Sequence, residues 1–193
     1  MTIGPRKQSE KLSDRDKAFL LFGKAMAAWA ALEMSFYIWF EHAMLLDMRQ
    51  AKPLYYAATN FKARLDLLRA AISSTKLEKE EQAFIEAAIK KAIKYSSFRN
   101  KLAHGEFTLE GLLIESKHAD YKAARSSAIT QREIETAARN FSKLAELIAD
   151  ARDYAIGLRD MLEEDSLEIC RQRVIELPLE AHSSTQNSMP AKR

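Results

Sequence analysis

The chain has 193 residues, of which 47% are hydrophobic, so it is long enough for one domain with a buried core and is not disordered as a whole. Five glycines and four prolines leave little material for the turns of an all-β fold, and the frequent Ala, Leu, Glu, Lys and Arg residues favour helices. A net charge of +3 requires any nucleic-acid site to be locally basic, and the single cysteine excludes an intramolecular disulfide and a cysteine-rich zinc site.

Residues 1–12 form a polar lead-in that lacks the features of an export signal, and Ser13 or Asp14 is expected to cap a first helix that runs to about Asp47. The stretch 19–46 is long and apolar enough to cross a bilayer. It also contains four polar or charged side chains: Lys24, Glu33, Glu41 and His42. Each charge near a bilayer centre costs about 2.5–3.5 kcal/mol, so we predict a buried helix and no membrane association.

Two further helices are expected before residue 105. Pro53 is suited to the first turn of a second helix, which covers Leu54 to about Ser73. Thr75, followed three positions later by Glu78, has the pattern of a capping box and predicts a third helix that reaches position 104. Gly105 is expected to end that helix in the left-handed conformation.

The hydrophobic period then changes. Residues 107–114 are typical of a short hairpin or an extended excursion, and 117–129 remain ambiguous. Thr130 and Glu133 form a second capping-box pattern, which opens a fourth helix to about 164. We therefore predict an all-α fold, an up-down four-helix bundle with a short hairpin or irregular excursion after the third helix. The bundle covers 13–165, and a largely disordered C-terminal extension covers 166–193.

The segment that carries chemistry is 99–104, Arg-Asn-Lys-Leu-Ala-His, at the end of the predicted third helix. Successive helical residues rotate by roughly 100°, so Asn100 lies about 100° and His104 about 140° from Arg99. A guanidinium, an amide and an imidazole therefore share one strip of the helix, and the small Ala103 leaves access to it. An apolar ridge on the same side, typical of a subunit interface with a cleft at one end, consists of Ile85, Ile89 and Ile93.

Arg99, Asn100, Ala103, His104 and Gly105 match the pattern Arg-Asn-x-x-Ala-His-Gly, which at the end of a long helix resembles the signature of the HEPN superfamily. The long helices extend the similarity loosely over about 14–165. The resemblance implies a helical bundle that dimerises so that two motifs face each other across one cleft, where active members cut RNA without a metal. It also implies a toxin or phage-defence effector, restrained by an antitoxin or nucleotidyltransferase partner. Some members of the superfamily lack nuclease activity.

The residue types of the motif fit RNA cleavage by the neighbouring 2′-OH, which needs proton transfer near neutral pH and positive charge on the phosphorane. His104 would transfer protons, Arg99 would bind the phosphate oxygens, and Asn100 would orient the ribose or His104. A dimer supplies two imidazoles that can share the roles of base and acid. We expect no cofactor and no metal site, because the other histidines show no ligand spacing.

Two other features are candidates for supporting roles. Glu33 lies in an apolar helix, so its carboxylate must be paired, hydrogen-bonded or neutral. It is a candidate to hold the side chain of Arg99 or His104 in position, although such a residue more often binds a neighbouring helix or faces solvent. Three lysines fall within about 40° of one another on the third helix, and these candidate RNA contacts, which more commonly form a solvated face, are Lys90, Lys94 and Lys101.

These observations leave hypotheses from different classes. The first is a cytoplasmic, homodimeric, metal-independent endoribonuclease with catalytic residues Arg99, Asn100 and His104. The second is a non-catalytic module for dimerisation or for nucleotide or RNA binding, in which residues 99–104 bind an anion or shape the interface. A third is a purely structural helical dimer.

Overall fold

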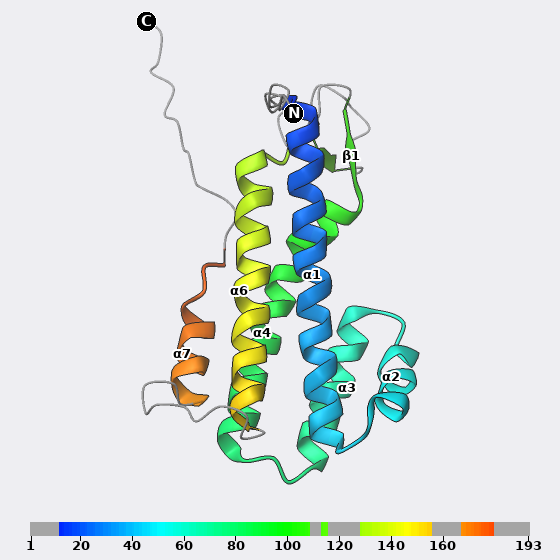
Figure 1. Cartoon of the computed structure of the whole chain (residues 1–193), viewed down its shortest axis with the longest axis vertical. Coiled ribbons are helices and arrows are strands. Elements are labelled where there is room, and N and C mark those ends of the chain that lie inside the picture. The colour runs from blue at the N-terminus through cyan, green and yellow to red at the C-terminus, as the bar shows by residue number, and fades with distance from the viewer. Residues whose placement is uncertain (1–11, 109–112, 116–127, 156–166, 180–193) are drawn as a thin grey trace, which may run out of the picture.

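The computed structural model describes residues 12–108, 113–115, 128–155 and 167–179 (Figure 1). Three long helices run along the molecule: α1 (Asp14–Met44), α4 (Lys79–Ala103) and α6 (Gln131–Ala155). In Figure 1, α1 and α6 run downward side by side, and α4 runs upward behind them. The short helices α2 (Met48–Ala57) and α3 (Phe61–Ser74) pack beside the lower half of α1, and α7 (Leu167–Glu176) lies on the other side. The predicted all-α helical bundle is therefore confirmed.

Both ends of α1 are set by local backbone bonding. The Ser13 Oγ accepts the N–H of Asp16 at 3.1 Å, which confirms Ser13 as the N-cap. The helix ends at Met44, because Leu45 takes the left-handed conformation with φ of 51° and its N–H returns to the carbonyl of His42. The prediction of about Asp47 for this end was too long.

The predicted second helix is wrong in its bounds, because two caps divide this segment into α2 and α3. The Asp47 carboxylate accepts the N–H of Gln50 at 3.0 Å and begins α2, so Pro53 lies inside a helix rather than in a first turn. The Asn60 Oδ1 accepts the N–H of Ala63 at 2.9 Å and begins α3. The side-chain oxygens of Asp47 and Asn60 bind backbone N–H groups that are free only in the first turn of a helix, so each residue marks a separate helix start.

The capping box predicted for the start of the third helix is displaced along the chain. Thr75 ends α3, and α4 begins after Glu78, whose N–H is bound by the Glu81 carboxylate at 2.7 Å. The second predicted box is confirmed: the Thr130 N–H donates to Glu133 Oε2 at 2.7 Å, and the Glu133 N–H donates to Thr130 Oγ1 at 3.2 Å. Helix α6 therefore begins at the predicted position.

A two-stranded antiparallel hairpin follows α4, as expected. Strand β1 (Gly105–Phe107) pairs with β2 (Leu113–Glu115), with Gly105 opposite Glu115, and Ile129 adds an isolated bridge to Leu113. Residues 109–112 and most of the ambiguous stretch 117–129 lie outside the described residues. The expected left-handed helix end at Gly105 is wrong, because His104 is the C-cap with φ of −106° and Gly105 already belongs to β1.

The main hydrophobic cluster draws buried side chains from every described helix. Helix α1 is long and apolar enough to span a membrane by length and composition. It nevertheless buries large side chains in this cluster, and the Trp39 indole donates to the carbonyl of Ile148 on α6 at 2.8 Å. The apolar side chains of α1 therefore contribute to the core of the bundle.

Part of the predicted C-terminal extension belongs to this core. Leu167, Cys170 and Val174 of α7 are buried against the other helices. The Lys91 ammonium on α4 donates to the carbonyls of Ile175, at 2.9 Å, and Leu177 at the end of α7. The packed bundle thus continues past 165, whereas residues 1–11 and 180–193 lie outside the described residues.

Candidate functional site

The predicted motif occupies the last turn of α4 and its cap, next to the hairpin. Asn100 and His104 are exposed, and Arg99 is half-buried. The His104 N–H donates to the Asn100 carbonyl at 3.0 Å, and His104 is the C-cap residue at which α4 ends. The opposite face of α4 is anchored in the core by Tyr95 and Leu102, which are 3% and 0% exposed.

Arg99 is a positive charge without a carboxylate partner among the described residues. Its guanidinium carbon lies 5.7 Å from the centre of the Trp29 ring, and its Nη1 donates to Asn100 Oδ1 at 3.2 Å. Its Nε is buried and has no hydrogen-bond partner in the described part of the chain. An unpaired buried donor costs about 1–3 kcal/mol, so this edge of the guanidinium favours an acceptor.

A pocket of about 430 Å³ lies beside Arg99 and Asn100, between α1, the first turn of α3 and α4. Its polar lining includes three cations, one carboxylate and two amides: Lys62, Arg64, Arg99, Glu33, Asn60 and Asn100. The Arg64 guanidinium is 3.1 Å from Glu33, and this pair is internally neutral. The positive charges of Lys62 and Arg99, which also line the pocket, have no carboxylate partner among the described residues.

Glu33 is bound to a neighbouring helix, which is the more common of the two expected outcomes. Its Oε1 accepts the Trp29 indole N–H at 2.6 Å, and its Oε2 accepts from Arg64 on α3 at 3.1 Å. It contacts neither Arg99 nor His104 by any hydrogen bond or ion pair in the described residues. Its influence on the motif is indirect, because it holds in place the indole over which Arg99 lies.

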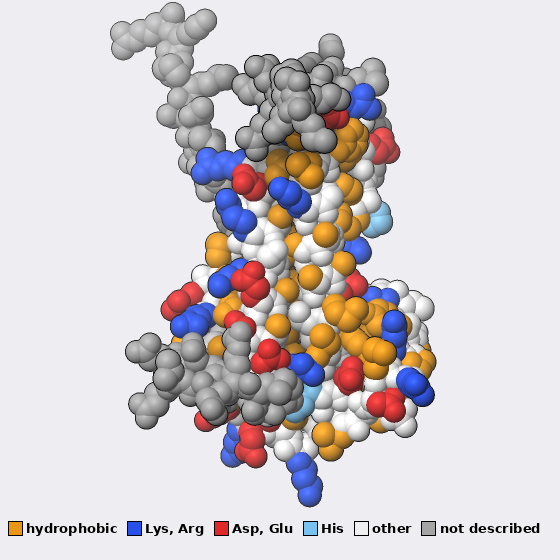
Figure 2. Space-filling view, viewed as in Figure 1, with side chains coloured by type: hydrophobic (Ala, Val, Ile, Leu, Met, Phe, Trp, Pro, Cys, Tyr) orange, Lys and Arg blue, Asp and Glu red, His pale blue; other side chains and the backbone are white. Residues whose placement is uncertain are grey.

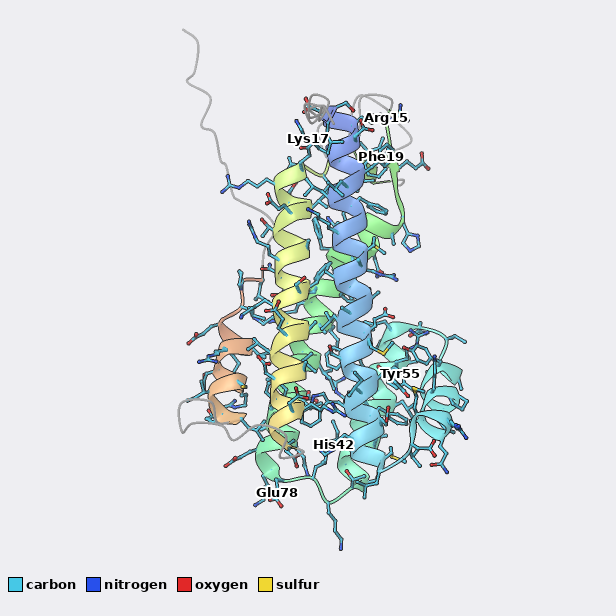
Figure 3. All side chains as sticks on the ribbon, in the orientation of Figure 1. Arg15, Lys17, Phe19, His42, Tyr55 and Glu78 are labelled. Atoms are coloured by element: carbon cyan, nitrogen blue, oxygen red, sulfur yellow. The ribbon has the colours of Figure 1, made fainter. Side chains whose placement is uncertain are left out.

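His104 does not line the pocket that contains Arg99 and Asn100. It faces solvent farther along α4, next to the hairpin. Another histidine, His42, lies at the far end of the bundle (Figure 3), where its Nε2 is 3.4 Å from Glu81 Oε1. A single chain therefore brings Arg99 and Asn100 together and leaves one imidazole exposed beside them.

The three predicted RNA-contacting lysines do not line the pocket. Lys90 is 69% exposed and lies 3.8 Å from Glu86, Lys94 is exposed, and Lys101 is half-buried. Basic and acidic side chains are interspersed on the face that Figure 2 shows. Lys62 lines the pocket instead, and it was not among the residues predicted from the sequence. Asn60, two positions earlier, is a helix-capping residue type and is the signal that could have placed Lys62 in a first helical turn.

The expected apolar ridge for a subunit interface is wrong for two of its three members. Ile85 and Ile89 are 0% exposed because neighbouring helices of the same chain cover them, whereas Ile93 is 39% exposed. Ile93 also lines the pocket. Of these three residues, Ile93 alone therefore adds exposed apolar surface, at the edge of the pocket.

Within the described residues, no three His, Cys, Asp or Glu side chains gather in a way that could hold a metal ion. Comparison with family models, curated proteins and solved structures found no match for this chain. The site is therefore assigned from its own residues and geometry.

Proposed function

We propose that this protein is a cytoplasmic, metal-independent endoribonuclease of the HEPN type, with a composite site formed where two copies meet. The observation that carries the proposal is the uncompensated Arg99, bonded to Asn100, with an exposed His104 at the cap of the same helix. This arrangement presents a permanent positive charge, an amide and a titratable imidazole from one rigid element.

Each group has a role that its position permits. The Arg99 guanidinium would stabilise the negative charge that develops on the phosphorane, because its forked donors match phosphate oxygens. Asn100, already bonded to Arg99, would orient the guanidinium or a ribose hydroxyl. His104 would take the proton of the attacking 2′-OH and return one to the leaving 5′-oxygen. In a dimer the two imidazoles can divide these steps.

The resemblance of the motif also supports a biological role. We propose a toxin or phage-defence effector, held in check by a protein partner such as an antitoxin or a nucleotidyltransferase. Such a partner would limit the cleavage of cellular RNA.

The proposal is tested by RNA cleavage in EDTA with wild-type protein and with His104→Ala and Arg99→Ala. We expect wild type to leave 2′,3′-cyclic phosphate ends and each variant to lose activity by about a hundredfold or more. Arg139→Ala is a matched control, because Arg139 is a 65% exposed arginine on α6 and should not be required. Wild-type rates in either motif variant would refute the assigned roles.

A second candidate function is a non-catalytic module that binds RNA or a nucleotide. It is favoured by one observation: Arg99 and Asn100 face the pocket, whereas His104 does not line it. The same assay separates the two candidates. Tight RNA binding without product in the wild-type protein would support the module and contradict the nuclease.

A further inference from the structure

The indole of Trp29 is fixed by side chains from three helices. Trp29 is 2% exposed, and its N–H donates to Glu33 Oε1, one turn along α1, at 2.6 Å. The rings of Phe61 on α3 and Phe141 on α6 meet the indole edge-on, with ring centres 4.7 Å and 5.1 Å away. Helix α1 lies between α3 and α6 (Figure 1), so close packing and one short hydrogen bond hold the indole in a single orientation.

The face of this ring carries the Arg99 guanidinium. The guanidinium carbon lies 5.7 Å from the ring centre, within the distance at which the electron-rich face of an indole attracts a cation. A carboxylate that accepts the indole N–H, as Glu33 does, adds negative charge beside the ring and strengthens this attraction. The position of Arg99 on α4 is therefore coupled to a residue of α1.

The burial of Arg99 Nε limits how the guanidinium can meet a phosphate. Nε is enclosed by protein, so a ligand has access only to the Nη side. The two Nη groups carry four hydrogens, of which one is donated to Asn100 Oδ1. A fork of two N–H groups recognises two phosphate oxygens only if its direction is fixed, and a free arginine side chain rotates about several bonds. The contact with Trp29 supplies that immobility.

We infer that Trp29 is a positioning residue, which fixes the Arg99 guanidinium so that its Nη edge meets the phosphate of the substrate. Glu33 in turn orients Trp29, and its bond to Arg64 at 3.1 Å ties the group to α3. Trp29 and Glu33 thus act through Arg99 and not on the substrate itself. Their effect on cleavage rests on the proposed function, whereas the immobility of Arg99 does not.

A tryptophan that only fills the core would behave differently from a positioning residue. Its loss would lower the free energy of unfolding and leave the kinetics of the folded protein unchanged. Loss of a positioning residue misplaces a group that stabilises the transition state, so kcat falls while KM changes little. The pH profile should also be retained, because the proton transfers are assigned to His104 and not to Arg99.

Glu33→Gln and Glu33→Met form a matched pair of variants. Both remove the ion pair with Arg64 and keep a side chain of similar length, but only glutamine keeps an oxygen that can accept the indole N–H. We expect kcat for RNA cleavage by Glu33→Met to be about tenfold below that of Glu33→Gln, with equal KM and pH profile. In an Arg99→Ala background the two variants should cut at the same rate, because the guanidinium that they position is absent.

Trp29→Phe is compared with Trp39→Phe. Trp39 is also buried, and its indole donates to the carbonyl of Ile148 at 2.8 Å. It packs against His42 at the far end of the bundle (Figure 3), away from Arg99. Both variants lose a buried indole and its hydrogen bond, so a loss of stability is common to them. Only Trp29→Phe should lower kcat, by about tenfold.

A measurement that needs no cleavage reports the position of Arg99 directly. The nuclear magnetic resonance signal of its buried Nε–H, assigned by its absence from Arg99→Lys, lies in the ring-current field of the indole. We expect this signal to stay in place in Glu33→Gln and Trp39→Phe. It should move or broaden in Glu33→Met and Trp29→Phe.

The inference would be overturned by equal kcat in the two Glu33 variants, by an Arg99 signal that is unmoved in Trp29→Phe, or by losses that multiply when Glu33→Met is combined with Arg99→Ala. A wild-type protein that cuts no RNA would refute the proposed nuclease by itself. The Arg99 signal would then still decide whether Trp29 fixes the guanidinium.

Discussion

Gly105 lies at the junction of the motif and the hairpin, in a position too tight for any side chain. A Cβ at this residue would lie 2.8 Å from Leu113 Cδ1 and 2.9 Å from the carbonyl oxygen of Lys101. It would also lie 3.1 Å from the carbonyl oxygen of Ile114. The hydrogen of glycine therefore lets β2 pack directly against the end of α4, and the position of His104 depends on this close approach.

Gly105→Ala should lower the free energy of unfolding by about 1–3 kcal/mol, because two of the three neighbouring atoms belong to the backbone and cannot move aside. Gly23→Ala is the matched control: a Cβ there meets nothing within 4 Å, and the residue lies inside α1. It should instead raise stability by about 0.5–1 kcal/mol. Urea denaturation measures both, and a Gly105→Ala variant as stable as wild type would contradict this account of the hairpin.

Helix α7 is held to the bundle by polar contacts at its end as well as by its apolar face. The buried Lys91 ammonium binds the carbonyls of Ile175 and Leu177, and the Tyr95 hydroxyl donates to the carbonyl of Pro178 at 2.8 Å. Burial, and secondarily the charge of Lys94, hold the pKa of Lys91 below its usual value. Donors on α4 therefore bind the carbonyls at the end of α7.

Lys91→Met should loosen α7 selectively, because methionine keeps most of the apolar stem and removes both hydrogen bonds. We expect the free energy of local opening of α7, measured by amide hydrogen exchange, to fall by about 1–2 kcal/mol. Lys90→Met, at a neighbouring exposed position, should leave exchange in α7 unchanged. Equal protection of α7 in the Lys91 variant and in wild type would show that the apolar face alone docks this helix.

At the scale of the whole molecule, the nuclease proposal depends on two copies sharing one site. Within the motif, one chain supplies the exposed imidazole of His104 and the guanidinium of Arg99, which has no carboxylate partner among the described residues and is directed to the pocket. Two copies would supply the second imidazole that a division of acid and base roles requires. Loss of either side chain from one copy should therefore be tolerated in part.

Co-expression of Arg99→Ala and His104→Ala chains tests this arrangement. Mixed dimers keep one guanidinium and one imidazole, so cleavage should recover by about tenfold or more over either variant alone. Sedimentation shows whether dimers form, and two different affinity tags isolate the mixed species. Mixed dimers no more active than either variant alone would contradict complementation between the copies, and a wild-type protein that sediments as a monomer would contradict the shared site.

The sequence alone was sufficient for features whose determinants lie within a few residues. Ser13, one of the two residues predicted to cap α1, and the predicted Thr130–Glu133 pair are observed as caps, because each bonds to the backbone of its own first turn. The helical period likewise placed Asn100 and His104 on one accessible strip of the helix, and both are exposed. Local hydrogen bonding and one amphipathic face specify the all-α class.

Tertiary structure decided the features that depend on segments far apart in the chain. The partner of Glu33 is Arg64 on α3, and Ile89 is covered by its own bundle rather than by a second copy. The pocket likewise exists only because the Asn60 cap brings the first turn of α3, with Lys62, beside Arg99 on α4. Which long-range neighbours meet is determined by packing the helices as a whole, and no periodicity within a single segment contains that information.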